Sequence, residues 1–366
     1  MPSTLFKPIE LRGVQVPNRI TVAPMCQYSA SDGVPSDWHL VHLGQFAQSG
    51  PGLIFVEATG VEPEGRITPG CTGLYDDATE AGFARIVAFM NSVGHSVVGI
   101  QLGHSGRKGS TVAPWEGGGL IEGPEAWKTE CASAVPYLPG WPEPRAMDAA
   151  AVKRVKAAFV DAAKRADRAG FDVIQLHIAH GYLLHQFLSP ITNQRTDNYG
   201  GSPENRMRFP LEIFEAVRAT FPDEKPVMVR LSATDWIEGG WDVDQSVVLC
   251  QALKDLGCDM VDVTSGGLDQ RQKITVGPGY QVGFSERIRR EAQIPTMAVG
   301  QITDPVQAET ILMSGQADMV ALARGMLWDP RWTWKAAVAM GEEIALPAPY
   351  ARCNPALRAT PFVSRK

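Results

Sequence analysis

The chain has 366 residues, of which 44% are hydrophobic and 20% are charged, and its formal net charge is −6. This balance is typical of a soluble globular protein and gives no electrostatic basis for binding nucleic acid or anionic membranes. No apolar run approaches the ~18 residues of a membrane-spanning helix, and the first residues lack the apolar core of a signal peptide. We therefore expect a cytoplasmic protein without a nucleic-acid or membrane partner.

The six cysteines indicate neither a zinc site nor a disulfide framework. None forms a C-x-x-C pair, and the spacing of Cys26, Cys71, Cys131, Cys250, Cys258 and Cys353 is irregular. Free thiols in a reducing compartment are the simplest interpretation.

Eight short apolar runs bounded by turn residues predict the strands. Most are continuous rather than alternating in polarity, which is typical of strands buried on both faces of a parallel sheet. The runs are Ile20–Pro24, Leu53–Ala58, Ser96–Leu102, Val173–Ile178, Val227–Leu231, Met260–Thr264, Thr296–Val299 and Met319–Ala323.

Helical stretches fall between most of these runs: Ala149–Ala169, Pro203–Thr220, Val243–Leu256, Ser285–Ala292, Pro305–Ser314 and Pro330–Met340. We expect Gly170 to end the first of them, and Asp304 and Asp329, each followed by proline, to begin the last two. Strands alternating with helices predict an α/β protein, a (β/α)8 TIM barrel forming a single domain over residues 1–366.

Two stretches depart from this alternation. Residues 4–17 resemble a β-hairpin that would plug the bottom of the barrel. Residues 104–146, approximately, are rich in Gly, Pro and Trp and predict a long loop after the third strand. Loops of such length usually act as lids or subunit contacts.

Polar side chains follow the predicted strands at the end where barrels of this kind carry their active sites. His177 and His180 can converge only if the strand ends near Ile178 and the chain turns, as Gly181 would allow. Two converging imidazoles could bind a metal or donate hydrogen bonds to a substrate oxygen, and ordinary packed histidines are the simpler alternative. The first strand lacks the H-x-H of metal-dependent barrel hydrolases, so we expect no metal.

Two further features are not needed by a purely structural barrel. Arg230 lies within an apolar run, where a charge is costly unless it is paired. The turn at Gly300 would let backbone N–H groups approach a phosphate, and Arg324 would add charge. Spacing alone leaves open the alternative of a tight turn with a surface salt bridge.

Taken in order, these segments resemble the Old Yellow Enzyme family of FMN-dependent ene-reductases, specifically its bacterial thermophilic-like subclass with the xenobiotic reductases. The similarity covers about residues 5–352. It is carried by Asn18–Ile20, Ala23–Tyr28, Asp37–Gly44, Val56–Thr59, Gly65–Gly70, Gln101–Lys108, His177–Pro190, Asn193–Phe209 and Ala323–Pro330.

The resemblance implies FMN as a non-covalent cofactor and NADPH or NADH as the reductant. The positions that match flavin contacts of the family are Ala23, Pro24, Met25, Cys26, Ala58, Gln101, Arg230, Gly300, Ala323 and Arg324. Of these, Arg230 would lie at the N1/O2 edge, where a guanidinium stabilises the reduced anion. Gly300 and Arg324 match the phosphate contacts.

The resemblance also implies the roles of the substrate-binding residues. His177 and His180 would bind the carbonyl or nitro oxygen of an activated alkene, hydride would reach the β-carbon, and Tyr182 would protonate the α-carbon. Tyr28 would contact the substrate. Cys26, a threonine in other branches, would tune the flavin rather than act as a nucleophile.

The resemblance implies that the nicotinamide uses the same pocket as the alkene, in alternation, and the sequence agrees, since no G-x-G-x-x-G follows any strand. The C-terminal tail, about residues 342–366, resembles a segment from which an arginine reaches into the neighbouring subunit's active site, and Arg352 matches it. We therefore expect a homodimer or homotetramer that acts on small electrophilic alkenes or nitro compounds.

Other classes fit less well. A dihydrouridine synthase would need a basic face for tRNA, and a dienoyl-CoA reductase would need a longer chain with iron–sulfur cysteines. A metal-dependent hydrolase would be colourless, and a flavin-storage protein would be yellow without turnover.

Overall fold

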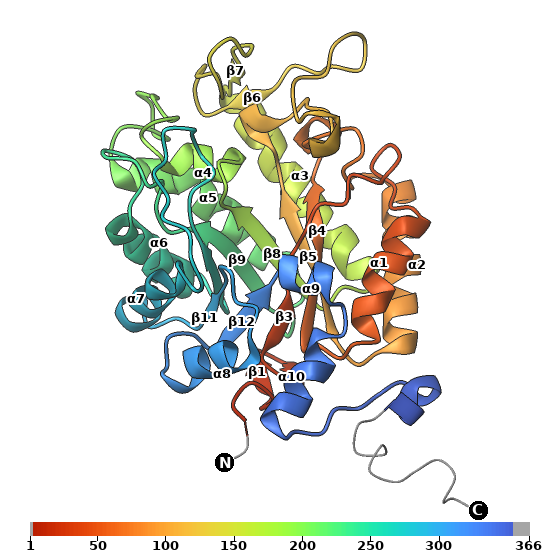
Figure 1. The fold of residues 1–366 in the computed structure, drawn as a ribbon. Helices are drawn as coiled ribbons and strands as arrows, with labels where there is room; N and C mark the ends of the chain where they lie inside the picture. Colours follow the sequence, from red (N-terminus) through yellow and green to blue (C-terminus); the bar gives the residue numbers. More distant parts are fainter. Residues whose placement is uncertain (1–2, 354–366) are drawn as a thin grey trace, which may run out of the picture.

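A computed structural model describes residues 3–353 as a closed barrel of eight strands, in which every neighbouring pair is parallel (Figure 1). The predicted barrel is therefore confirmed. In order around the barrel, the strands are β3 (Ile20–Val22), β4 (Leu53–Gly60), β5 (Val97–Gly103), β8 (Val173–Ile178), β9 (Val227–Ser232), β10 (Val261–Thr264), β11 (Thr296–Ala298) and β12 (Met319–Leu322).

Helices surround this barrel. They are α1 (Asp37–Ala47), α2 (Asp77–Val93), α3 (Ala149–Arg168), α5 (Pro203–Arg218), α6 (Val243–Asp255), α7 (Val282–Ala292), α8 (Pro305–Met313) and α10 (Trp332–Met340), with two short helices, α4 (Leu183–Leu188) and α9 (Arg324–Trp328). The helices α1, α2, α4 and α9 are not among those predicted from the sequence. None of the helices within residues 3–353 combines the length and the apolar character that crossing a membrane requires.

The predicted helix ends are confirmed at two of three positions. Gly170, with φ +90°, follows α3, and Asp304 caps α8 by accepting hydrogen bonds from the backbone N–H groups of Val306 and Gln307. The third prediction is wrong, because Asp329 and Pro330 lie in a turn before α10. The N–H of Trp332 bonds to the carbonyl of Asp329, and Arg331 is the N-cap.

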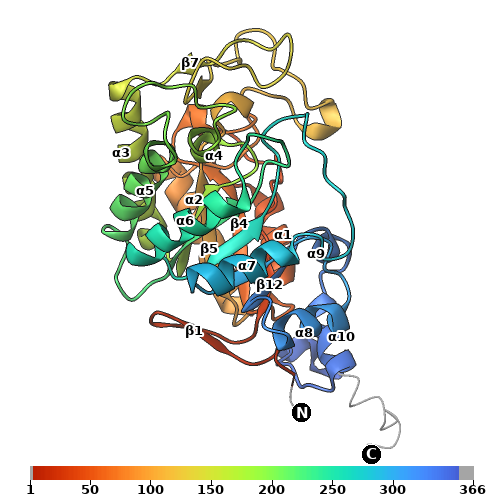
Figure 2. The ribbon, with the colours of Figure 1, turned by 90° about the vertical axis from the view of Figure 1, so that its left-hand side faces the viewer.

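The predicted hairpin is formed by β1 (Ile9–Leu11) and β2 (Val14–Val16) and plugs the end of the barrel where the strands begin. Leu11 and Val16 are buried against side chains from the first residues of the strands, among them Met228, Met260 and Met297. Figures 1 and 2 show this hairpin at one end of the barrel and the 104–146 stretch at the other. The hairpin therefore covers one end of the barrel, and the 104–146 stretch lies at the opposite end.

The 104–146 stretch has some regular structure of its own: the 3-10 turns η2 (Gly106–Lys108) and η3 (Pro114–Glu116), and the short parallel strands β6 (Glu130–Cys131) and β7 (Arg145–Ala146). Arg107 connects this stretch to the barrel through hydrogen bonds. Its guanidinium donates to the carbonyls of Val135 (3.2 Å), Pro136 (2.8 Å) and Leu268 (2.9 Å). The stretch is thus held across the ends of the strands.

The tail follows α10 and passes through the 3-10 turn η4 (Ala348–Cys353) at the hairpin end of the barrel. There, Tyr350 packs edge-on against Trp334, and the guanidinium of Arg331 lies 5.1 Å from the centre of the Tyr350 ring. The remainder of the predicted tail segment, residues 354–366, lies outside the described residues.

Candidate active site

The chain turns sharply after β8, and this turn brings three rings together. His180 and Gly181 both adopt left-handed backbone angles, with φ of 58° and 72°. A Cβ on residue 181 would lie 2.4 Å from the carbonyl oxygen of Gly267, so only glycine fits. The ring of His177 lies 5.2 Å from that of His180 and 4.9 Å from that of Tyr182, measured between centroids. The predicted convergence of the two histidines is confirmed.

The two imidazoles make different hydrogen bonds, and the one to His177 fixes its tautomer. The backbone N–H of Ala179 donates to Nδ1 of His177 (3.3 Å), which leaves the ring proton on Nε2, free to be donated. Nε2 of His180 is 3.0 Å from the Thr264 hydroxyl. Burial, followed by the charge of Arg230, holds the pKa of both histidines well below the usual range. Both rings are therefore neutral at physiological pH, and His177 keeps a free Nε2–H.

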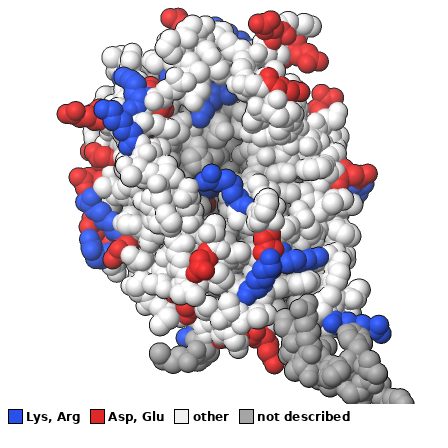
Figure 3. All heavy atoms as spheres, viewed as in Figure 1, with Lys and Arg blue, Asp and Glu red and all other residues white. Residues whose placement is uncertain are grey.

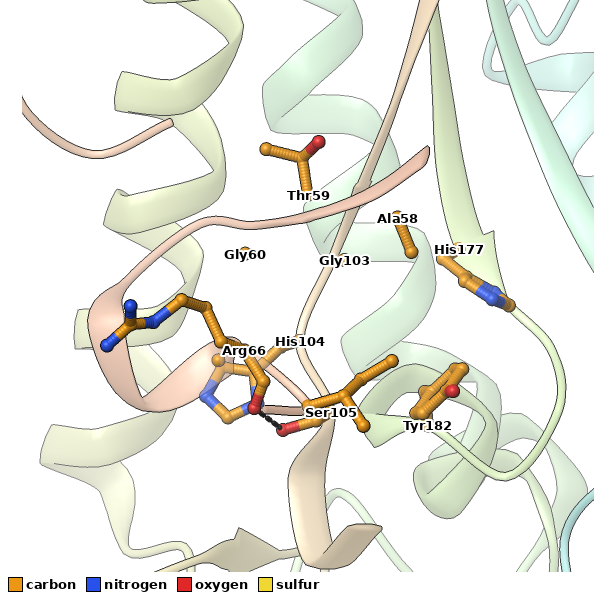
Figure 4. A pocket seen from close by; sticks show the side chains of 11 residues that line it. Ala58, Thr59, Gly60, Arg66, Gly103, His104, Ser105, His177 and Tyr182 are labelled. Carbon is orange, nitrogen blue, oxygen red and sulfur yellow. Dashed lines mark hydrogen bonds between the residues drawn. The ribbon is translucent and has the colours of Figure 1, made fainter. Parts of the chain in front are cut away.

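Tyr182 begins α4 beside this pair, and burial raises the pKa of its phenol well above the usual value. Figure 4 shows Tyr182 and His177 beside a small cavity, with Ala58 and Gly103 also on its wall. Tyr182 is thus a protonated acid facing the space next to the histidines.

A chain of polar side chains crosses the barrel interior below these rings. Nε2 of Gln101 donates to Oε1 of Gln175 (2.6 Å), and Nε2 of Gln175 donates to Oδ2 of Asp262 (3.3 Å). That same oxygen lies 3.2 Å from Nε of Arg230. Asp262 therefore offsets the charge of Arg230, which would be costly to bury without a partner.

Arg230 is nevertheless only 7% exposed, and its Nε, which faces Asp262, makes no hydrogen bond within residues 3–353. It lines a cavity of about 640 Å³ together with Gly300, Ala323 and Arg324. Buried donors without partners are rare in native proteins. The unused donors of Arg230 therefore indicate that a ligand completes this cavity.

Gly300 lies on the wall of the same cavity, where only glycine fits. Its φ is +128°, and a Cβ there would lie 2.9 Å from the side-chain nitrogen of Gln281. Arg324 is exposed at the rim, and Ala323 precedes it as the N-cap of α9. Figure 3 shows that this face of the molecule is hollowed near its middle, with Lys or Arg side chains on the wall. The geometry agrees with an anionic group held near Gly300.

The segment after β3 forms another wall of the site. Ala23 and Met25 line a small cavity with Glu57, whose Oε2 accepts the N–H of Gln27 (3.0 Å). A hydrogen bond between Cys26 and Cys71, followed by burial, raises the pKa of the Cys26 thiol. Cys26 is therefore a thiol rather than a thiolate.

Tyr28 adopts a left-handed conformation (φ 51°) and meets Trp115 of the 104–146 stretch edge-on, with ring centroids 5.6 Å apart. Ala58 follows a register shift between β4 and β5. Ala58, Cys26, Tyr28 and Tyr182 are partly exposed, as residues that line an open site would be.

Arg352 is the predicted site residue that the fold keeps apart from the rest. It is exposed on η4, and neighbouring Tyr350 lines a groove with residues 47–51 and 91–95, which precede β4 and β5. Arg352 thus lies at the end of the barrel opposite the histidines of its own chain.

Four further residues near the site were not singled out from the sequence: Cys71, Lys108, Gln175 and Asp262. Gln175 stands two positions before His177, and Asp262 two positions after Met260, so the two-residue period of a strand could have placed them inside the barrel. Cys71 lies in a loop, where no period applies. In the described part of the chain, no three His, Cys, Asp or Glu side chains gather as ligands for a metal ion.

Comparison with known proteins agrees with this geometry. Residues 4–343 match the NADH:flavin oxidoreductase / NADH oxidase family. The chain is 44% identical to NADPH dehydrogenase of Geobacillus thermodenitrificans over 358 residues, which cover 96% of this chain and 99% of that protein.

Two solved structures are similar over nearly the whole chain. One is morphinone reductase (TM-score 0.78, 30% identity), with 95% of this chain and 92% of that one covered. The other is the Old Yellow Enzyme homologue from Zymomonas mobilis (TM-score 0.75, 28% identity), with 94% of each covered.

Proposed function

The chain belongs to the NADH:flavin oxidoreductase / NADH oxidase family, the Old Yellow Enzyme group of FMN-dependent NAD(P)H oxidoreductases, and from this premise we propose that it reduces activated C=C bonds. The observation that carries the proposal is the convergence of His177, His180 and Tyr182 at the open end of the barrel. The substrates would be α,β-unsaturated carbonyl compounds and nitroalkenes.

The residues present fit FMN. Arg230 has donors to spare, and together with Gly300 and Arg324 it lines a cavity large enough for a cofactor. We assign Ala23, Pro24, Met25, Cys26, Ala58, Gln101 and Arg230 to the flavin ring, and Gly300, Ala323 and Arg324 to the phosphate side. When bound, FMN would supply the chemistry of accepting hydride from NAD(P)H and passing hydride to the β-carbon of the alkene.

The histidines would act on the substrate oxygen. His177 has a free Nε2–H, and both rings are neutral, so they can donate hydrogen bonds without bringing a charge into the pocket. Such bonds withdraw electrons from the conjugated alkene and stabilise the negative charge that develops on its oxygen. The β-carbon becomes electrophilic as a result.

Tyr182 would complete the reaction as the general acid. Its phenol remains protonated at neutral pH and lies next to His177, so it can protonate the α-carbon while the histidines hold the oxygen. Tyr28 would contact the alkene from the opposite wall. Cys26, held as a thiol, would modulate the flavin.

The nicotinamide would alternate with the alkene in one pocket. We also propose a dimer in which Arg352 completes the partner's site, because Arg352 is exposed and remote from the histidines of its own chain.

An anaerobic titration tests the proposal. Purified protein that is yellow, bleaches with NADPH and regains its colour with 2-cyclohexenone would display both half-reactions. Colour that returns only with oxygen would contradict alkene reduction while leaving the flavin barrel intact. A colourless protein carrying metal would make the histidines ligands and overturn the proposal.

A further inference from the structure

The ammonium group of Lys108 lies next to Tyr182, and the reaction described above does not use it. Its Nζ donates to the carbonyl of His180 (2.8 Å) and to the carbonyl of Gly267 (2.9 Å). The same nitrogen lies 5.0 Å from the centre of the Tyr182 ring and 4.9 Å from that of Tyr137. Lys108 therefore binds the turn that aligns the site and faces the ring of the proposed acid.

No carboxylate within residues 3–353 forms an ion pair with Lys108. The charged or titratable groups around it are Arg107, its neighbour in η2; Tyr137 of the 104–146 stretch; and His177, His180 and Tyr182 after β8. Burial, with a smaller contribution from Arg107, lowers the pKa of Lys108 to about 7. The site thus disfavours the ammonium form of Lys108, yet near neutral pH a fraction of the molecules still carries an unpaired cation beside Tyr182.

A cation over a phenol ring favours the ionised form of that phenol. When Tyr182 gives up its proton, the negative charge spreads from the oxygen into the ring, and an ammonium over the ring attracts this anion more strongly than the neutral phenol. Burial acts in the opposite direction and makes Tyr182 a weak acid. The ammonium of Lys108 offsets part of that penalty.

We propose that Lys108 is a positioning residue for the protonation step, which holds the His180–Tyr182 turn and stabilises the phenolate that Tyr182 becomes. In this step the O–H bond of Tyr182 breaks, its electron pair stays on the oxygen, and a C–H bond forms at the α-carbon. Solvent then returns a proton to the phenolate. The inference rests on the proposed function of the site.

The charge of Lys108 and its hydrogen bonds can be separated. A neutral amine keeps two N–H donors, so raising the pH through about 7 removes the charge while both carbonyl bonds can remain. Replacement by methionine removes both contributions. Replacement by arginine keeps a charge that does not titrate below pH 12 or so.

The experiment measures reoxidation of NADPH-reduced holoenzyme by stopped flow from pH 6 to pH 9, with two oxidants. 2-Cyclohexenone requires a proton at its α-carbon. 1-Nitrocyclohexene yields a nitronate anion that is stable without one. The variants are Lys108→Met, Lys108→Arg and a matched control, Lys128→Met. Lys128 is exposed in the same stretch and donates only to the carbonyl of Glu143.

We expect Lys108→Met to slow reoxidation by the enone about 10-fold at pH 6, and reoxidation by the nitroalkene far less. In the wild type, the enone rate should fall as the pH rises through about 7, whereas Lys108→Arg should show no such fall. The Lys128→Met control should match the wild type throughout.

Equal losses with both oxidants would show that Lys108 merely supports the fold, and unchanged rates would show that it does nothing in the step. Either result overturns the inference. Wild-type enzyme that is reoxidised by neither compound would instead overturn the proposed function.

A second measurement does not depend on turnover. Tyr182 is replaced by 2,3,5-trifluorotyrosine, whose phenol ionises several pH units lower than tyrosine, and its ¹⁹F resonance is titrated in the holoenzyme. The pKa at position 182 should be higher with Lys108→Met than with Lys108→Arg, whose charge persists throughout the titration. An identical pKa in both variants would contradict the stabilisation of the phenolate.

Discussion

The lower and upper levels of the barrel interior are formed by the same strands but carry opposite chemistry. Near the hairpin, the inward positions hold Met228, Met260, Met297 and Met319, all fully buried in an apolar cluster. Two residues further along β9 and β10, the inward positions hold Arg230 and Asp262, which are partners in the strand register. A step of two residues along a strand thus separates the level that stabilises the barrel from the level that binds ligands.

The difference shows how one sheet can be both rigid and reactive. The apolar level has no polar groups to satisfy, so its contribution comes from packing alone. The polar level contains an arginine with unused donors and rests on that packed base. Substitutions at the two levels should therefore alter different properties, and the following experiments test that separation.

The largest effect is expected at the top of the site. His177→Ala removes one donor to the substrate oxygen and should slow reoxidation by 2-cyclohexenone about 100–1,000-fold. Reduction by NADPH and the thermal midpoint of unfolding serve as controls. A loss of thermal stability that accounts for the lost rate would remove the distinction between the two levels.

Met228→Ala probes the apolar level. Deleting a fully buried side chain should lower the free energy of unfolding by about 2–5 kcal/mol. Chemical denaturation measures that change, and the rate per bound flavin at 25 °C should remain that of the wild type. A rate that falls in step with stability would mean that the levels are not independent.

Asp262→Asn tests the polar level of the barrel interior, which lies between His177 and Met228. The amide can still accept from Gln175, but the charge opposing Arg230 is lost, so the reduced anionic flavin should be favoured. We expect the midpoint potential to rise by about 30 mV, which for two electrons corresponds to ~1.4 kcal/mol. Dye-coupled reduction of the holoenzyme measures it, and an unchanged or lower potential would argue against Arg230 lying at the flavin.

Cys26→Ala should have the smallest effect. The thiol is held by Cys71 and is protonated, so its loss should shift the flavin potential and leave turnover in place. Spectroscopic redox titration and steady-state rates with an enone together check this expectation. Complete loss of turnover with flavin still bound would make Cys26 essential to the chemistry.

The fold was predictable because each strand is an apolar run closed by turn residues, and this signal needs no distant partner. The convergence of His177 and His180 was predictable for a related reason, since Gly181 marks the turn that it requires. The proximity of Lys108 to Tyr182 was not, because the 104–146 stretch and two strands decide where these side chains meet. The predicted start of α10 was wrong because Asp329 and Pro330 match the sequence pattern of a helix N-terminus but lie in a separate turn before the helix.

The joining of the chain's two ends has a consequence for synthesis in the cell. β3 pairs with β12, and Glu309 accepts hydrogen bonds from the backbone of Thr4 and Leu5 and from the hydroxyl of Ser3, 306 residues earlier. A growing chain cannot close its barrel until β12 has left the ribosome. Until then, the hairpin and the edge of β3 are unpaired, because the segments that they bind have not been synthesised. A nascent chain would therefore depend on protection against association with other nascent chains.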